Sequence, residues 1–279
     1  MEPTPSVQRA TRTYLFVPGT RPERFDKALA SGADAVVLDL EDAVAIDDKA
    51  QARESISAWL FAAAPAARAR VVVRINDAGS SWFKQDLRSL LLAGLTQVML
   101  PKAESAQQVA EVLAALPDAQ VLALIESARG VAHVDTIAAA PGVSRLVFGT
   151  LDYALDLDLD TETDAIGLAY AASRIAIASR VAGLAAPVAG VTPQIDDDAR
   201  LRADWAGARA QGFGAKLCIH PKQVATLHAA MQPSAEAVAW AERVLAAEAA
   251  SPGAAQLDGR MVDRPVVLQA QRTLLLARH

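Results

Sequence analysis

The sequence contains very little cysteine. Cys218 is the one cysteine among 279 residues, so no disulfide can form within the chain, and a reducing cytoplasm is the expected location. Cys218 lies inside an apolar run, where we expect a buried, inert thiol and not a nucleophile.

Three further features are missing. No apolar run reaches the roughly 18 residues needed to cross a bilayer, and the N-terminal segment MEPTPSVQRA has no apolar signal region. Acidic residues outnumber basic ones, 32 to 27, and the net charge of -5 lacks the basic footprint of a nucleic-acid-binding protein. These absences predict a cytoplasmic protein that acts on neither membranes nor nucleic acids.

Hydrophobic residues are abundant, at 52% of the chain, and they recur in eight short runs. Continuous apolar runs are typical of strands buried on both faces of a parallel sheet. Eightfold alternation with helical stretches is the pattern of a (β/α)8 TIM barrel. The runs are YLFVPG from Tyr14, AVVLDLED from Ala35, VVVRIN from Val71, QVMLPK from Gln97, VLALIE from Val121, RLVFG from Arg145, APVAGV from Ala186 and KLCIHP from Lys216.

The length fits one barrel of roughly 250 residues with a small addition. We predict the barrel over residues 1–230 and a C-terminal helical extension over 231–279, which is available for oligomer contacts or for closing a site. Between the runs, Ser105 is expected to cap one helix and residues 129–140 to form another.

Acidic residues follow two neighbouring runs, at the barrel edge where this fold carries its chemistry. Glu126 comes directly after VLALI, and Asp152 follows the next run. A buried carboxylate requires a partner or a metal, and two carboxylates without a His or Cys beside them suit a hard cation such as Mg²⁺. The alternative is a structural ion pair between Glu126 and Arg129.

Arg74 ends the run VVVRIN. A guanidinium at a barrel mouth suits bidentate binding of a substrate carboxylate. The alternative is a salt bridge to Glu41 or Asp42, which end the second run. Two other run ends, Lys102 and His220, are expected to be an ion-pairing lysine and a hydrogen-bonded structural histidine.

A basic cluster follows the first run. Arg21, Arg24 and Lys27 suit either the phosphates of a nucleotide-like handle or a solvated helix face.

Eight segments, in order from about Thr13 to Ala277, together resemble one family. They are LFVPGTRPERFDKAL, GADAVVLDLEDAV, VVRIN, MLPKAES, LALIESARG, FGTLDYA, GFGAKLCIHP and GRMVDRP. The sequence is similar to the citrate lyase β-subunit-like group of the HpcH/HpaI aldolase superfamily, which includes malyl-CoA and citramalyl-CoA lyases.

The resemblance implies a (β/α)8 barrel that assembles as a homotrimer or hexamer. It also implies Mg²⁺-dependent making or breaking of a C–C bond in a β-hydroxyacyl thioester, with a 2-keto acid and an acyl-CoA, or an acyl-carrier thioester, as partners. By position, Glu126 and Asp152 match the metal ligands, and Arg74 matches the residue that binds the keto-acid carboxylate.

Three further positions follow from the same resemblance. Phe16 and Lys27 match residues that line the acyl-CoA pocket. Asp263, in the motif GRMVDRP, matches an acid/base residue that enters the neighbouring subunit's site. A carboxyl group so placed can move the hydroxyl proton during C–C cleavage.

Two positions depart from the family pattern. Leu151 stands where many relatives have a second acidic residue beside the metal ligand, and Ala189 stands where many have an aspartate. Replacing these carboxylates could change the acyl group accepted. Two other functions remain open: a class II pyruvate aldolase acting on free hydroxy-keto acids, as in the other branch of the superfamily, and, because of these two departures, a binding subunit that needs a partner, like the citrate lyase β-subunit.

Overall fold

The computed structural model describes residues 11–161, 166–251 and 255–277. Eight parallel strands close into a barrel in chain order, with each strand paired to its sequence neighbours and β1 paired to β8. The (β/α)8 fold predicted from the eight apolar runs is therefore confirmed. The strands are β1 (Thr13–Pro18), β2 (Ala35–Asp39), β3 (Val71–Arg74), β4 (Gln97–Leu100), β5 (Gln120–Ile125), β6 (Val143–Phe148), β7 (Val188–Ala189) and β8 (Ala215–Cys218).

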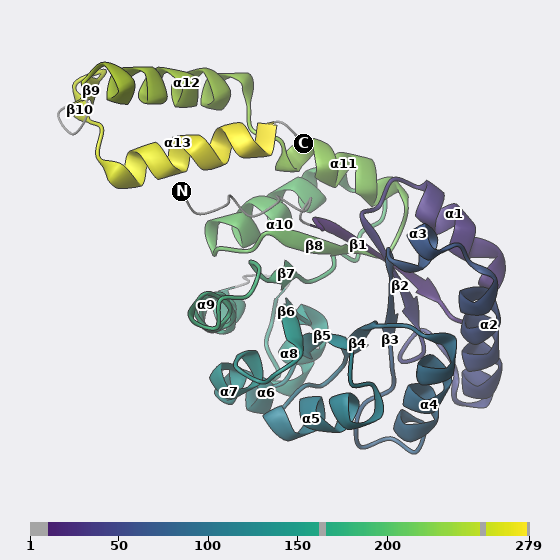
Figure 1. Cartoon of the computed structure of the whole chain (residues 1–279). Helices are drawn as coiled ribbons and strands as arrows, with labels where there is room; N and C mark the ends of the chain where they lie inside the picture. Colours follow the sequence, from purple (N-terminus) through teal and green to yellow (C-terminus); the bar gives the residue numbers. More distant parts are fainter. Residues whose placement is uncertain (1–10, 162–165, 252–254, 278–279) are drawn as a thin grey trace. The chain divides into compact units, whose positions relative to one another are not determined.

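The helices of the barrel lie outside the ring of strands (Figure 1). Side-chain N-caps stabilise the starts of several of them: Ser105 and Gln108 form a capping box, Ser127 accepts from the Gly130 amide, and Asp197 accepts from the Arg200 amide. The segment 129–140 is two short helices that meet at His133 instead of the single helix predicted. The barrel helices, including short 3₁₀ turns, are η1 (Pro22–Arg24), α1 (Phe25–Ala30), η2 (Ile46–Asp48), α2 (Lys49–Ala62), α3 (Pro65–Arg68), α4 (Phe83–Ala93), α5 (Ala106–Ala115), α6 (Ala128–Ala132), α7 (Val134–Ala138), α8 (Thr150–Asp156), α9 (Ile166–Val181), α10 (Asp198–Ala210) and α11 (Lys222–Met231).

Side chains on alternate strand positions fill the barrel interior. Because successive side chains of a strand point to opposite faces, one parity faces inward on every strand. The apolar members of this inward set close the barrel as a packed core and not as a pore. They are Tyr14, Ala35, Val37, Val72, Met99, Leu122, Leu124, Val147, Val188, Ala215 and Leu217. The same parity determines which residues at the carboxyl ends of the strands face the barrel mouth.

The chain folds as two compact units, with the boundary between Leu227 and His228 inside α11. The second unit contains α12 (Ala235–Ala250), β9 (Gln256–Leu257), β10 (Arg260–Met261) and α13 (Arg264–Ala277). In this unit α12 packs along α13 (Figure 1). Its hairpin turns at Asp258-Gly259, both with positive φ, as a two-residue type I′ turn requires. A small apolar core of its own holds the unit together.

No helix in the described part of the chain has both the length and the apolarity of a membrane span. Cys218 is buried on β8, as predicted, and burial raises the pKa of its thiol to about 12. The thiol is therefore protonated and unreactive at neutral pH.

Candidate functional site

Arg74 lies at the mouth of the barrel and is bound by a carboxylate that faces the same way. Strand parity continues inward from Val37 to Asp39 and from Val72 to Arg74, and the two residues are paired in register. The guanidinium donates from Nε to Asp39 Oδ1 at 2.7 Å and from Nη2 to Asp39 Oδ2 at 2.6 Å. This bidentate ion pair is buried on both sides and fixes the plane of the guanidinium.

Two more carboxylates contact the third nitrogen of Arg74. Nη1 lies 2.8 Å from Glu41 Oε2 and 3.4 Å from Asp42 Oδ2. The ring of Phe16 stacks on the guanidinium, with its centroid 4.9 Å from Cζ. The salt bridges to Glu41 and Asp42, raised as the alternative role of Arg74, are thus present in the structure. Together with Asp39 they hold the pKa of Arg74 above its usual range, although burial opposes this effect.

Lys102 connects the Arg74 cluster to Glu126. Its Nζ donates to Glu41 Oε1 at 2.6 Å, and its backbone amide donates to Glu126 Oε1 at 2.8 Å. The backbone at Lys102 is left-handed, with φ of 47°, a conformation that disfavours any residue other than glycine. This strained conformation turns the amide toward Glu126. The ion pair expected of Lys102 is confirmed.

Glu126 directly follows β5, continues its inward parity and is 4% exposed. Burial raises the pKa of its carboxyl to about 8, and the charges on Glu41 and Asp152 add to this shift, while the Lys102 amide and Arg74 oppose it. Arg129, the alternative partner considered for Glu126, lies 3.7 Å from Glu104 instead. The alternative prediction, a structural ion pair between Glu126 and Arg129, is therefore wrong.

Gly149 gives Glu126 its space. A Cβ built on Gly149 would lie 2.5 Å from Glu126 Oε2 and 2.6 Å from its Cβ, closer than real side chains approach. Gly149 lies between β6 and α8, and the first turn of α8 carries half-buried Asp152. The chain thus turns from strand to helix against the Glu126 side chain and brings the second carboxylate beside it.

The donor set fits a divalent cation with few protein ligands. No group of three or more His, Cys, Asp or Glu side chains arranged to hold a metal occurs in residues 11–161, 166–251 and 255–277. A pair of carboxylates matches Mg²⁺, which keeps several waters and takes only one or two carboxylates. Carboxylates also outnumber cations around Glu126, and a divalent cation would offset that excess. Glu126 and Asp152 are the residues that would hold it.

Two other predicted site residues, Lys27 and Asp263, are exposed. Lys27 is exposed on α1, and its neighbours Arg21 and Arg24 form exposed ion pairs with Glu23. Asp263 is exposed in the C-terminal unit, where its Oδ1 accepts from the Val266 amide and so caps the start of α13. This capping role was not predicted, although an Asp with Pro close behind it at a helix start is a known signal.

Asp39 is a site residue that was not predicted from the sequence. It is fully buried and bonded to Arg74 through both of its oxygens. A signal was available, because in AVVLDLED the inward parity of Ala35 and Val37 continues to the aspartate. His220, in contrast, behaves as predicted: its Nδ1 accepts from the Lys222 amide in a local turn.

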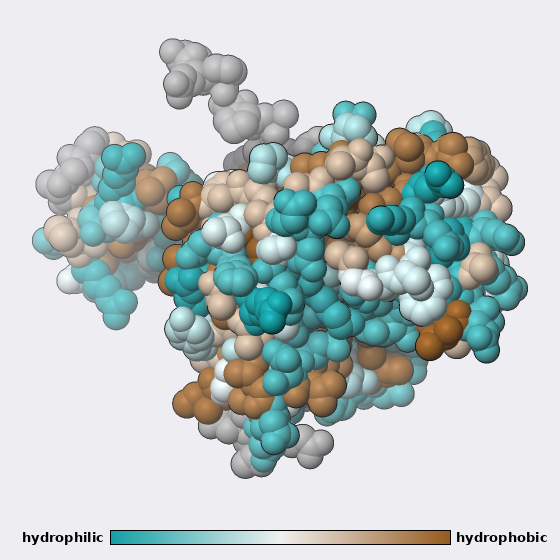
Figure 2. Space-filling view, turned by 90° about the horizontal axis from the view of Figure 1, so that it is seen from below, coloured by the Kyte–Doolittle hydropathy of each residue, from teal (hydrophilic) through white to brown (hydrophobic). Residues whose placement is uncertain are grey.

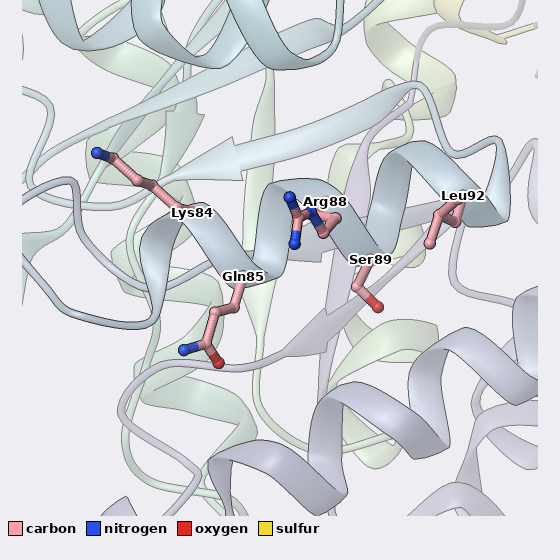
Figure 3. A pocket seen from close by; sticks show the side chains of 5 residues that line it. All are labelled: Lys84, Gln85, Arg88, Ser89 and Leu92. Carbon is pink, nitrogen blue, oxygen red and sulfur yellow. The ribbon is translucent and has the colours of Figure 1, made fainter.

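A hollow of about 420 Å³ lies elsewhere, on the outer face of α4. Figure 3 shows that its five labelled side chains all project from this one helix: Lys84, Gln85, Arg88, Ser89 and Leu92. It contains no carboxylate and none of the residues around Arg74. The hollow is therefore not the predicted site.

A model of the HpcH/HpaI aldolase/citrate lyase family matches residues 12–221, the whole of the barrel up to the start of α11. The chain belongs to this family. Curated members are similar over nearly the full length. A citrate lyase subunit beta-like protein of Mycobacterium tuberculosis (strain H37Rv) is 40% identical over 274 residues, covering 96% of each chain. A (3S)-malyl-CoA thioesterase of Cereibacter sphaeroides is 33% identical, covering 95% of this chain and 94% of the relative.

Solved structures of HpcH/HpaI family members agree with the fold. The CitE protein of Mycobacterium tuberculosis in complex with magnesium, acetoacetate and coenzyme A superposes with a TM-score of 0.88 at 38% identity, covering 97% of this chain and 99% of that one. A citrate lyase beta subunit from the same organism, complexed with oxaloacetate and magnesium, has a TM-score of 0.72 at 36% identity over 81% of this chain and 98% of that one.

Proposed function

We propose that this protein is a Mg²⁺-dependent lyase that makes or cleaves a C–C bond in a β-hydroxyacyl thioester, giving a 2-keto acid and an acyl-CoA. The supporting observation is that the charges of Arg74 and Asp152 both act on the buried carboxyl of Glu126, which directly follows β5. Relatives with magnesium and acetoacetate, oxaloacetate or coenzyme A bound make the same ligand classes reasonable here.

Each residue of the cluster has a part in this reaction. Arg74 donates one Nη2 proton to Asp39, which leaves the other to bind the carboxylate of the keto-acid portion. Glu126 and Asp152 would hold the cation, which supplies Lewis-acid chemistry when bound. Asp39, Glu41 and Phe16 keep the guanidinium in place, so that the substrate is oriented before reaction.

Asp263 is proposed to move the proton. In cleavage, a carboxylate removes the hydroxyl proton, the C–O bond becomes a carbonyl, and the C–C electron pair passes to the thioester fragment as an enolate. Protonation of the enolate carbon then yields the acyl-CoA. We assign the proton transfer to Asp263 from a neighbouring subunit of a homotrimer or hexamer, and Phe16 and Lys27 to the acyl-CoA pocket.

An assay of purified protein with malyl-CoA, citramalyl-CoA and citryl-type thioesters tests the proposal. We expect keto acid to appear only with Mg²⁺ present. Asp263→Asn should keep magnesium binding and stability, because asparagine also caps helices well, and should lose at least about 100-fold in kcat. If none of these thioesters reacts, the proposed lyase activity is wrong. If Asp263→Asn turns over normally, Asp263 does not transfer the proton.

A thioesterase is the second candidate, favoured by the 33% identity to the (3S)-malyl-CoA thioesterase of Cereibacter sphaeroides. The two reactions give different products from malyl-CoA. A lyase releases glyoxylate and acetyl-CoA without a free thiol, whereas a thioesterase releases malate and a CoA thiol that reacts with a disulfide dye. A CoA-independent reaction with free hydroxy-keto acids would instead indicate an aldolase, and binding without turnover would indicate a subunit that needs a partner.

A further inference from the structure

The outer face of α9 carries an exposed apolar stripe. At 100° per residue, its members fall within about 60° of one another around the helix. They are Ile166, Tyr170, Ile177 and Val181, which are 74%, 69%, 55% and 84% exposed. The opposite face of α9 is buried on the barrel through small and branched side chains. The stripe is therefore a second apolar face, which the barrel does not use.

The apolar surface extends to α8, which packs beside α9. Leu151 and Leu155 are one turn apart on α8 and are 52% and 80% exposed. In Figure 2 hydrophobic side chains gather along the lower edge of the molecule. Monomeric proteins seldom expose contiguous apolar patches beyond a few hundred Å², so this surface has the character of a protein interface.

The spacing of the stripe identifies its partner. Successive members are four, seven and four residues apart, so the pattern reads the same in both directions. Its midpoint lies between Ser173 and Arg174. A surface whose spacing is unchanged when the helix direction is reversed can pack against the same surface of a second copy related by a twofold axis. We propose that α9 pairs antiparallel with α9 of a second copy of this chain across a twofold axis near Ser173.

In this arrangement each large side chain meets another. Tyr170 lies opposite Ile177 of the second copy, and Ile166 opposite its Val181. Ser173 is small and exposed at the centre, which permits the close approach of about 8–10 Å that packed helices adopt. The Arg174 guanidinium is drawn aside to Asp135 at 2.7 Å, so it does not place two like charges on the axis. The stripe is about 22 Å long, at 1.5 Å per residue.

The pairing concerns assembly and does not depend on the reaction proposed above. A twofold contact joins only two copies. The pairing therefore gives a dimer by itself, and it joins two trimers into a hexamer if a threefold contact is also present.

Molar mass measured by light scattering after size exclusion tests the pairing. Ile177→Lys places two charges in the interface, and we expect the mass of the assembly to fall by half with an unchanged circular dichroism spectrum. Leu92→Lys is the matched control, because Leu92 is 70% exposed on α4 and should leave the mass unchanged. Equal masses for the wild type and Ile177→Lys would overturn the proposal.

A disulfide tests the axis directly. Cys218 is buried, so Ser173→Cys introduces the one accessible thiol of the described chain. Mild oxidation should convert most of this variant to a covalent dimer on a non-reducing gel, whereas Gln85→Cys on α4 should stay monomeric. A mass that falls in Ile177→Lys without cross-linking of Ser173→Cys would mean that another surface covers the stripe, and the twofold pairing would be wrong.

Discussion

Lys102 shows how one backbone angle can organise a site. Its left-handed conformation gives its amide to Glu126 while its ammonium binds Glu41, so the carboxylate proposed to hold the metal and the cluster around Arg74 are joined through a single residue. Such conformations persist only where surrounding contacts maintain them, and they concentrate at functional sites.

Two substitutions distinguish the effect of the backbone conformation at Lys102 from the effect of its charge. Lys102→Gly and Lys102→Ala both remove the ammonium, but glycine adopts positive φ without steric cost. We expect Lys102→Gly to be more stable than Lys102→Ala by about 1 kcal/mol, measured by urea unfolding at pH 7. Equal stabilities would show that the conformation at this position carries no strain.

Lys216 is a buried cation outside the site. Its Nζ donates to the Gly190 carbonyl at 2.7 Å, and burial lowers the pKa of the ammonium from 10.5 to about 8, against the attraction of Asp204. Between these values the unfolded chain binds more protons than the folded one, so stability rises with pH. Lys216→Met lacks this dependence.

We therefore expect the free energy of unfolding of the wild type, relative to Lys216→Met, to rise by on the order of 2 kcal/mol between pH 7.5 and 10. Denaturant titrations of both proteins at several pH values measure the difference. A difference that stays constant or falls over this range would show that Lys216 keeps an ordinary pKa in the folded protein.

At the scale of the elements, strand ends and the turns that follow them position the chemistry. Gly149 illustrates this, since it lets the chain pass from β6 into α8 against the Glu126 side chain. In contrast, Gly207 lies within α10 with no atom within 4 Å of an added Cβ and without a positive φ. An added methyl group therefore collides with Glu126 at Gly149, whereas at Gly207 it has open space.

Replacing each by alanine should give opposite results. Gly207→Ala should raise stability by about 0.5–1 kcal/mol, because alanine is the better helix former. Gly149→Ala should displace the Glu126 carboxylate and weaken magnesium binding at least about tenfold, as measured by calorimetry. Unchanged magnesium affinity in Gly149→Ala would contradict the assignment of Glu126 as a ligand.

At the scale of the whole molecule, the chain places its proposed acid/base residue outside the barrel. Asp263 belongs to a compact unit with its own core, while Arg74 belongs to the barrel. If Asp263 acts in a neighbouring subunit, two inactive variants should complement each other. Asp263→Asn then supplies an intact barrel, and Arg74→Ala supplies an intact C-terminal unit.

Mixing Asp263→Asn with Arg74→Ala chains, unfolded together and refolded, should restore part of the activity. Each variant refolded alone should stay inactive, which controls for the treatment itself. No recovery in mixed assemblies, with the assembly size preserved, would place Asp263 in the site of its own chain or outside the mechanism.

The sequence determined the barrel, its strand order and the residues at the strand ends, because burial on both faces leaves continuous apolar runs and alternate side chains follow a fixed parity. It also identified Arg74 and Glu126 as candidates. Only the tertiary structure decided their partners: Asp39 binds Arg74, Lys102 bonds Glu126 through its amide, and Arg129 turns to Glu104. Ion pairs depend on distances across the barrel mouth between residues far apart in the chain, and local patterns carry no information about those distances.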